Sequence, residues 1–110
     1  MSKRYLAFDI ETAKVLPELV TDLLAHRPLG ICCAAAVAID RPSANIWHGR
    51  MASGTPAPRM TPVEVQGLVR DLGNLVSEGY THVTWKGQGF DLDVLAEESG
   101  LPRESAALAL

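Results

Sequence analysis

An alternation of apolar and acidic side chains near the N terminus constrains the fold more than any other feature. Residues 5–12 read YLAFDIET. Successive side chains of a strand point to opposite faces, so Asp9 and Glu11 would share one face, with Cα atoms roughly 7 Å apart. Desolvated carboxylates need a cationic partner, and Mg²⁺ or Mn²⁺ accept carboxylate and water oxygens. The stretch predicts either a divalent-metal site at the end of a core strand, or a loop capped by Asp9 with Glu11 in solvent.

The composition limits the chain to one domain. At 110 residues, 47% of them hydrophobic, it can bury a modest core. A formal net charge of -3 provides no basic field for nonspecific nucleic-acid binding, so a polyanion would have to be held through metal ions and backbone contacts. No signal peptide precedes Tyr5, and no apolar run approaches the ~20 residues of a membrane span. We therefore expect a cytoplasmic protein.

The only two cysteines, Cys32 and Cys33, are adjacent within an apolar run. Neighbouring residues of a strand face opposite sides, so we expect two buried thiols on different faces. A metal or redox site is the alternative, but no second cysteine pair exists to complete one.

Turn residues and periodicity predict the other elements of the first half. The apolar run 30–39 predicts a central strand, and the turn residues 40–43 connect it to an outer strand at 44–50 with Trp47 facing inward. Residues 18–25, which lie between two prolines, predict a short helix. Residues 51–60 contain glycine and proline and predict a loop.

The clearest helix begins after Thr61. Thr61 supplies a cap, Pro62 the first helical position, and Glu64 completes a capping box. One face of this helix carries apolar residues at helical spacing: Val65, Leu68, Val69, Leu72, Leu75 and Val76. Arg70 and Asp71 lie on the opposite face and predict a solvated surface.

The remaining elements complete a mixed α/β arrangement. Gly79 predicts the end of the helix, residues 80–85 a strand, and residues 86–89 a turn. A last helix would begin near Phe90 or Asp91 and end at Ser99-Gly100. A first strand, an antiparallel meander, and a helix returning to a parallel strand describe a mixed sheet.

Two motifs together resemble the ribonuclease-H-like 3′-5′ exonucleases of the DEDD superfamily, which includes polymerase proofreading domains. The first is FDIET at residues 8–12; the second is VTWKGQGFDLDVL at residues 83–95, where the family usually has an Asn-Gly turn and then Phe-Asp before a helix. The resemblance covers essentially the whole chain, which looks closest to predicted stand-alone bacterial exonucleases. It implies a ribonuclease-H-like fold.

The resemblance also implies roles for individual residues. Two divalent ions, Mg²⁺ or Mn²⁺, would bind with Asp9 bridging both, Glu11 holding the ion that binds the attacking water, and Asp91 assisting the second ion. Phe90 and Thr12 would then lie beside the terminal nucleotide of the substrate, although Phe90 also suits the core. Lys86 stands where the family has Asn, and would contact phosphate, pair with an acid, or point to water.

One family motif has no counterpart. The third, a Tyr or His followed by the fourth Asp, lies on a last helix after a further strand, whereas this sequence ends at Leu110. We expect residues 1–110 to be the N-terminal portion of a single ribonuclease-H-like domain, with the last strand and helix missing. The strand ending at Trp85 would then be an edge that permits self-association. The three histidines lie outside the motif positions and are expected to be structural or solvated: His26, His48 and His82.

Two functional hypotheses follow. The first is a metal-dependent 3′-5′ exonuclease acting on nucleic-acid 3′ ends, or the N-terminal fragment of one, with catalytic Asp9, Glu11 and Asp91. The alternative is a noncatalytic ribonuclease-H-like module that binds nucleic acid or protein. A ribonuclease H or resolvase is a weaker third reading, because those enzymes arrange their acids differently. The motifs do not distinguish DNA from RNA.

Overall fold

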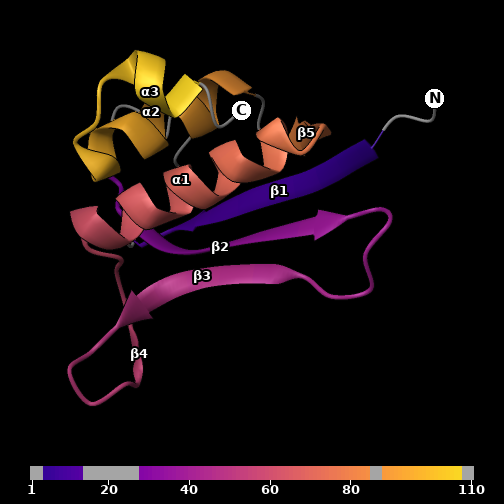
Figure 1. Ribbon diagram of the computed structural model, residues 1–110. Helices are drawn as coiled ribbons and strands as arrows, with labels where there is room; N and C mark the ends of the chain where they lie inside the picture. Colours follow the sequence, from indigo (N-terminus) through magenta and orange to yellow (C-terminus); the bar gives the residue numbers. More distant parts are fainter. Residues whose placement is uncertain (1–3, 14–27, 85–87, 108–110) are drawn as a thin grey trace, which may run out of the picture.

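The computed structural model describes residues 4–13, 28–84 and 88–107 and has a mixed α/β fold (Figure 1). One five-stranded sheet has the order β4-β3-β2-β1-β5. Helices lie together on one side of it (Figure 1). The elements are β1 Arg4–Thr12, β2 Ile31–Ala38, β3 Asn45–Arg50, β4 Pro56–Ala57, α1 Pro62–Ser77, β5 Tyr80–Thr84, α2 Gln88–Ser99 and α3 Arg103–Ala107.

The strand pairing matches the predicted mixed sheet. β1 pairs antiparallel with β2, and β2 pairs antiparallel with β3. α1 then carries the chain back to β5, which pairs parallel with β1. Within the described part of the chain β5 is an edge strand, as predicted.

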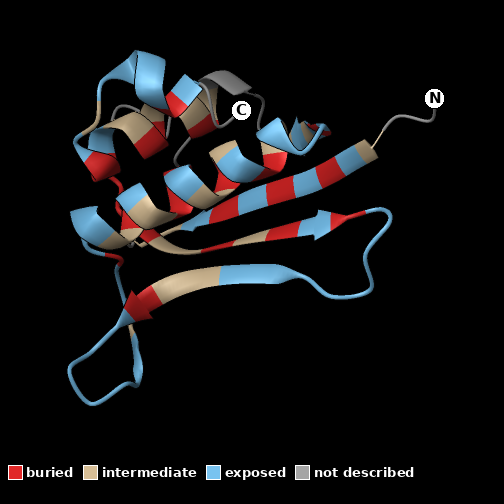
Figure 2. Ribbon diagram, viewed as in Figure 1, coloured by how far each residue is buried: buried red, intermediate tan, exposed pale blue. Residues whose placement is uncertain are grey.

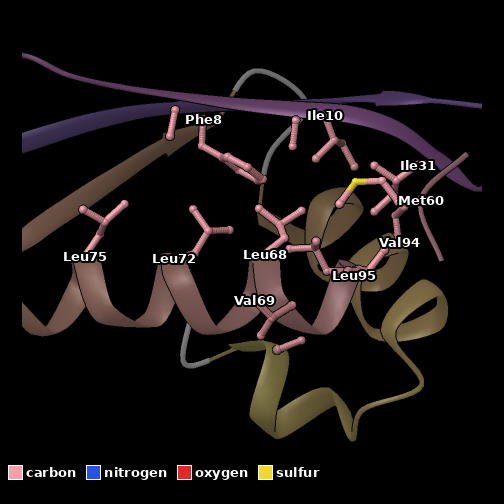
Figure 3. Close-up of a cluster of buried hydrophobic side chains, with 14 of the residues drawn as sticks. Phe8, Ile10, Ile31, Met60, Leu68, Val69, Leu72, Leu75, Val94 and Leu95 are labelled. Atoms are coloured by element: carbon pink, nitrogen blue, oxygen red, sulfur yellow. The ribbon is translucent and has the colours of Figure 1, made fainter. Parts of the chain in front are cut away.

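The core lies between one face of the sheet and the helices. On β1, Leu6, Phe8 and Ile10 are buried while the residues between them are exposed, which gives the strand its striped pattern in Figure 2. Phe8 points toward Leu68 and Leu72 of α1, and Ile10 lies beside Met60 (Figure 3). The opposite face, which we call the open face, carries no helix among the described residues.

The predicted start and end of α1 are confirmed. The Thr61 hydroxyl accepts from the Glu64 amide at 3.2 Å, and the Glu64 carboxylate accepts from the Thr61 amide at 2.8 Å. Gly79 follows the helix with φ +100°, a conformation that favours glycine. Asp71 is not simply solvated, however. Its carboxylate accepts a hydrogen bond from Nε1 of Trp47 at 2.9 Å, because Trp47 faces inward beneath α1.

Several boundaries differ from the sequence expectations. The loop over residues 51–60 contains the short strand β4, and α3 was not predicted. α2 begins at Gln88, two residues before Phe90, so the predicted turn at 86–89 is shorter. The predicted helix over residues 18–25 and the positions of Trp85 and Lys86 lie outside the described residues.

The N-terminal end of β1 is held by a closed polar network. Arg4 donates from Nε to Asp40 at 3.0 Å, from Nη2 to the Tyr80 hydroxyl at 2.7 Å, and from Nη1 to the Glu78 carbonyl at 2.7 Å. The Tyr80 hydroxyl donates to Asp40 at 2.7 Å. This bond, and then the Arg4 guanidinium, lower the pKa of Asp40 against the opposing effect of desolvation. Each charge in this network therefore has a protein partner.

No helix in the described part of the chain is long and apolar enough to cross a membrane.

Candidate functional site

Asp9 and Glu11 lie side by side on the open face at the C-terminal end of β1. Both are exposed, because they alternate with the buried Phe8 and Ile10 (Figure 2). The register places Asp9 opposite Ala35 and Glu11 opposite Cys33 on β2. The predicted sharing of one face is therefore confirmed.

Neither carboxylate is paired with another side chain in the part of the chain that the structure describes. Among the described residues, no hydrogen bond or salt bridge reaches the side chain of Asp9 or Glu11. Two neighbouring carboxylates without a partner repel each other, and a divalent cation between them would relieve the repulsion. Mg²⁺ keeps several waters and binds proteins through one or two carboxylates, so this donor pair fits a hydrated hard cation.

A hollow of about 400 Å³ opens on the face beside Asp9. Its walls come from the adjacent strands β2, β1 and β5, and most of them are small or branched side chains. This volume falls within the range of small-molecule sites. The lining residues are Ala7, Phe8, Asp9, Ala35, Val37, Val83 and Thr84.

A β-bulge places both cysteines on the open face, next to the acid pair. Glu11 pairs with Cys33, but Thr12 pairs with Ile31, so Cys32 is an extra residue in β2. Ile31 and Ala34 both face the core, with exposed fractions of 0% and 2%. The two residues between them must therefore lie together on the open face.

This placement corrects the sequence expectation for the cysteines. The thiols are free and half-buried rather than fully buried, and they do not face opposite sides. Burial raises the pKa of Cys33, and the neighbouring Cys32 raises it further, followed by Glu11 and Asp9. The two thiols and two carboxylates thus lie close enough to affect one another.

Asp91 has a different setting. It lies in the first turn of α2, as predicted, but it is 2% exposed and shares the buried stripe of that helix with Val94 and Leu95. Asp9 and Glu11, by contrast, are exposed on the open face. In residues 4–13, 28–84 and 88–107, no three or more His, Cys, Asp or Glu side chains are arranged to hold one ion. The structure therefore brings together the first two predicted acids and leaves Asp91 in the interior.

α2 is linked to the same end of the sheet by an ion pair between the exposed Arg59 and the buried Glu98. Nη2 of Arg59 donates to the Glu98 carboxylate at 2.7 Å, and the Glu98 side chain is only 6% exposed. A Cβ placed on Gly30 would lie 2.8 Å from Nε of Arg59 and 3.2 Å from Ala13, so Arg59 passes close to the residue after β1. Arg59 thereby links α2 to the candidate-site end of β1.

The predicted substrate contacts have mixed placements. Phe90 is half-buried and packs against the core. Thr12 is half-buried and pairs with Ile31 on the core side of the bulge. Lys86 lies outside the described residues. His82 is structural: its ring meets Phe8 edge-on at 6.1 Å, and both ring nitrogens are buried without a hydrogen-bond partner.

Sequence reasoning missed the two cysteines. The run CCAAA at residues 32–36 has no alternation of polar and apolar side chains, so nothing in it fixes which residues face inward. The bulge becomes visible only through the pairing of Thr12 with Ile31.

Comparison with known proteins adds no relative. A scan against protein-family models finds no match, and neither a search of curated proteins nor one of solved structures finds a similar protein.

Proposed function

We propose that this chain is a metal-dependent 3′-5′ exonuclease, or the N-terminal part of one, that hydrolyses phosphodiester bonds at nucleic-acid 3′ ends. The observation that carries the proposal is the exposed pair Asp9 and Glu11, which has no partner among residues 4–13, 28–84 and 88–107 and lies beside an apolar hollow. The two motifs that resemble the DEDD exonucleases support it. A mixed sheet with β1 antiparallel to β2 and parallel to β5 is consistent with a ribonuclease-H-like fold.

The two carboxylates would hold Mg²⁺ or Mn²⁺ through their oxygens. When bound, such ions supply an activated water and neutralise charge developing on the leaving 3′ oxygen. A cation also reverses the local field, so that a polyanion can approach a chain of formal net charge -3.

The hollow beside Asp9 would receive the terminal nucleotide. Its walls include Ala35, Val37 and Val83, whose apolar surfaces suit the face of a base. Phe90 is half-buried and packs against the core, so it would support the site rather than contact the nucleotide. Asp91 would assist the second ion, directly or through water.

The test is degradation of a 5′-labelled single-stranded oligonucleotide in Mn²⁺, with EDTA as the metal-free arm. We expect a ladder that shortens from the 3′ end, and a loss of rate of at least about 100-fold for Asp9→Asn and for Glu11→Gln. A ladder that is equally strong in both variants would reject the proposal, because a contaminating nuclease or another site would then be responsible.

A noncatalytic binding module is the second candidate. It is favoured by the burial of Asp91, which contrasts with the exposed acid pair, and by the exposure of Val37, Ile46 and Val83 on the open face. Folded protein that binds the oligonucleotide in Mn²⁺ without shortening it would support this candidate over the exonuclease.

A further inference from the structure

The adjacent cysteines have a geometry that the proposed exonuclease does not use. Ile31 and Ala34 both face the core, and the bulge leaves Cys32 and Cys33 together on the open face. Both thiols are free and half-buried, and no described helix covers that face. Reagents can therefore reach two sulfur atoms from the same side.

A disulfide is not the natural product of this pair. Consecutive Cα atoms are about 3.8 Å apart across a trans peptide, whereas disulfides usually join Cα atoms about 4.4–6.8 Å apart. β2 is also held extended by its pairing with β1 on one side and β3 on the other. An atom inserted between the two sulfurs removes the need for direct S–S contact.

We propose that Cys32 and Cys33 form a dithiol site for soft, thiophilic ions that bind through two sulfurs, the class that includes Cu⁺ and trivalent arsenic. Thiolate ligands prefer soft ions. Asp9 and Glu11 border the site with negative charge, which disfavours anions. Two sulfurs suffice for these ions, so no third ligand is required from the described residues. The proposal is independent of the nuclease activity.

Phenylarsine oxide is a suitable probe because its reaction needs no oxidant. Two As–S bonds form, the arsenic–oxygen bond breaks, and the two thiol protons leave with that oxygen as water. Arsenic stays trivalent and both sulfurs keep their oxidation state. Closing the second bond within one protein raises the affinity by about 100-fold or more over a single thiol.

The experiment is intact-mass analysis of the native chain after incubation with phenylarsine oxide. We expect one adduct per chain that survives excess 2-mercaptoethanol and is removed by 2,3-dimercaptopropanol. Cys32→Ser and Cys33→Ser are matched controls that each keep one thiol. Their adducts should dissociate at a 2-mercaptoethanol concentration about 100-fold lower. Circular dichroism verifies that each variant is folded.

Two results would overturn the proposal. One is an adduct of the native chain that 2-mercaptoethanol removes as readily as it does from the single-cysteine variants. The other is an adduct that forms only in denaturant, since thiols on opposite faces of a strand would meet only after unfolding. Loss of the adduct leaves the oligonucleotide assay unaffected, so failure of this proposal and failure of the proposed function are separate outcomes.

Discussion

The charged side chains at the two ends of β1 differ in whether they have protein partners. At the N-terminal end, Arg4 and Asp40 are joined to each other and to the Tyr80 hydroxyl by hydrogen bonds of 2.7 to 3.0 Å. At the C-terminal end, Asp9 and Glu11 have no such partner among the described residues. Both ends are partly solvated, so burial does not explain the contrast. Charge satisfied within the protein serves the fold, whereas charge left without a partner is available to a ligand.

The largest expected effect separates the two ends by activity. Asp9→Asn should lower oligonucleotide cleavage by at least about 100-fold and leave the unfolding midpoint unchanged or slightly raised, because it relieves repulsion with Glu11. Asp40→Asn removes the same charge from the N-terminal end and should preserve the cleavage rate while lowering the midpoint. Cleavage assays and thermal unfolding of both variants make the comparison. Equal loss of activity in the two would mean that the two ends do not differ as described.

A second prediction concerns the stability that a buried, paired carboxylate contributes at the candidate-site end of β1. Arg59→Met leaves Glu98 in the interior without its charged donor, and should cost about 2 kcal/mol in the free energy of unfolding. Arg70→Met is the matched control, because Arg70 is exposed and its contact with Asp71 is long, at 3.7 Å. It should change stability by less than about 0.5 kcal/mol. Urea denaturation measures both, and a cost for Arg70→Met as large as that for Arg59→Met would contradict the assignment.

A smaller effect tests the network at the N-terminal end. Tyr80→Phe keeps the buried ring but removes the hydroxyl that joins Arg4 to Asp40, and should cost about 1 kcal/mol. Because the network lowers the pKa of Asp40, its contribution is present above the ordinary carboxyl pKa and is lost as the pH falls through the lowered value. The variant should therefore lose part of the acid dependence of stability. Unchanged unfolding curves from pH 2 to pH 7 would show that the network contributes nothing measurable.

The smallest predicted effect concerns His82, which packs against Phe8 beneath α1. Burial lowers its pKa, and the nearby Leu72 carbonyl only partly offsets this, although it forms no hydrogen bond with the ring. The unfolded chain then binds the proton more readily, so stability should be constant above about pH 6.5 and fall as the pH drops below it. His82→Leu should abolish that slope. Chemical denaturation between pH 5 and pH 8 tests it, and a persistent slope in the variant would assign the titration to another group.

Much of the fold was predictable where the sequence has a regular alternation of apolar and polar residues or a clear helix-capping signal. The alternation through Phe8, Asp9, Ile10 and Glu11 fixed which face of β1 is buried, and the capping box at Thr61 fixed the start of α1. Such signals are local, and tertiary packing agrees with them.

The site was less predictable because it depends on relations between strands. The bulge at Cys32 changes which side chains of this alanine-rich strand face the core, and no local sequence pattern predicts it. Asp91 is buried because of the face that α2 turns toward the core, and a Phe-Asp helix start does not determine that face. Sequence motifs thus identified the acidic residues but not their mutual placement.

The central claim, that the acid pair and not the polar network binds a divalent cation, is tested most directly by titrating ¹⁵N-labelled protein with Mn²⁺. Paramagnetic Mn²⁺ broadens the amide resonances nearest to it. We predict early broadening at Asp9, Glu11 and Cys33, with Arg4 and Asp40 unaffected, and loss of that broadening in Asp9→Asn. Broadening first at the Arg4 end, or the same broadening in Asp9→Asn, would contradict the account.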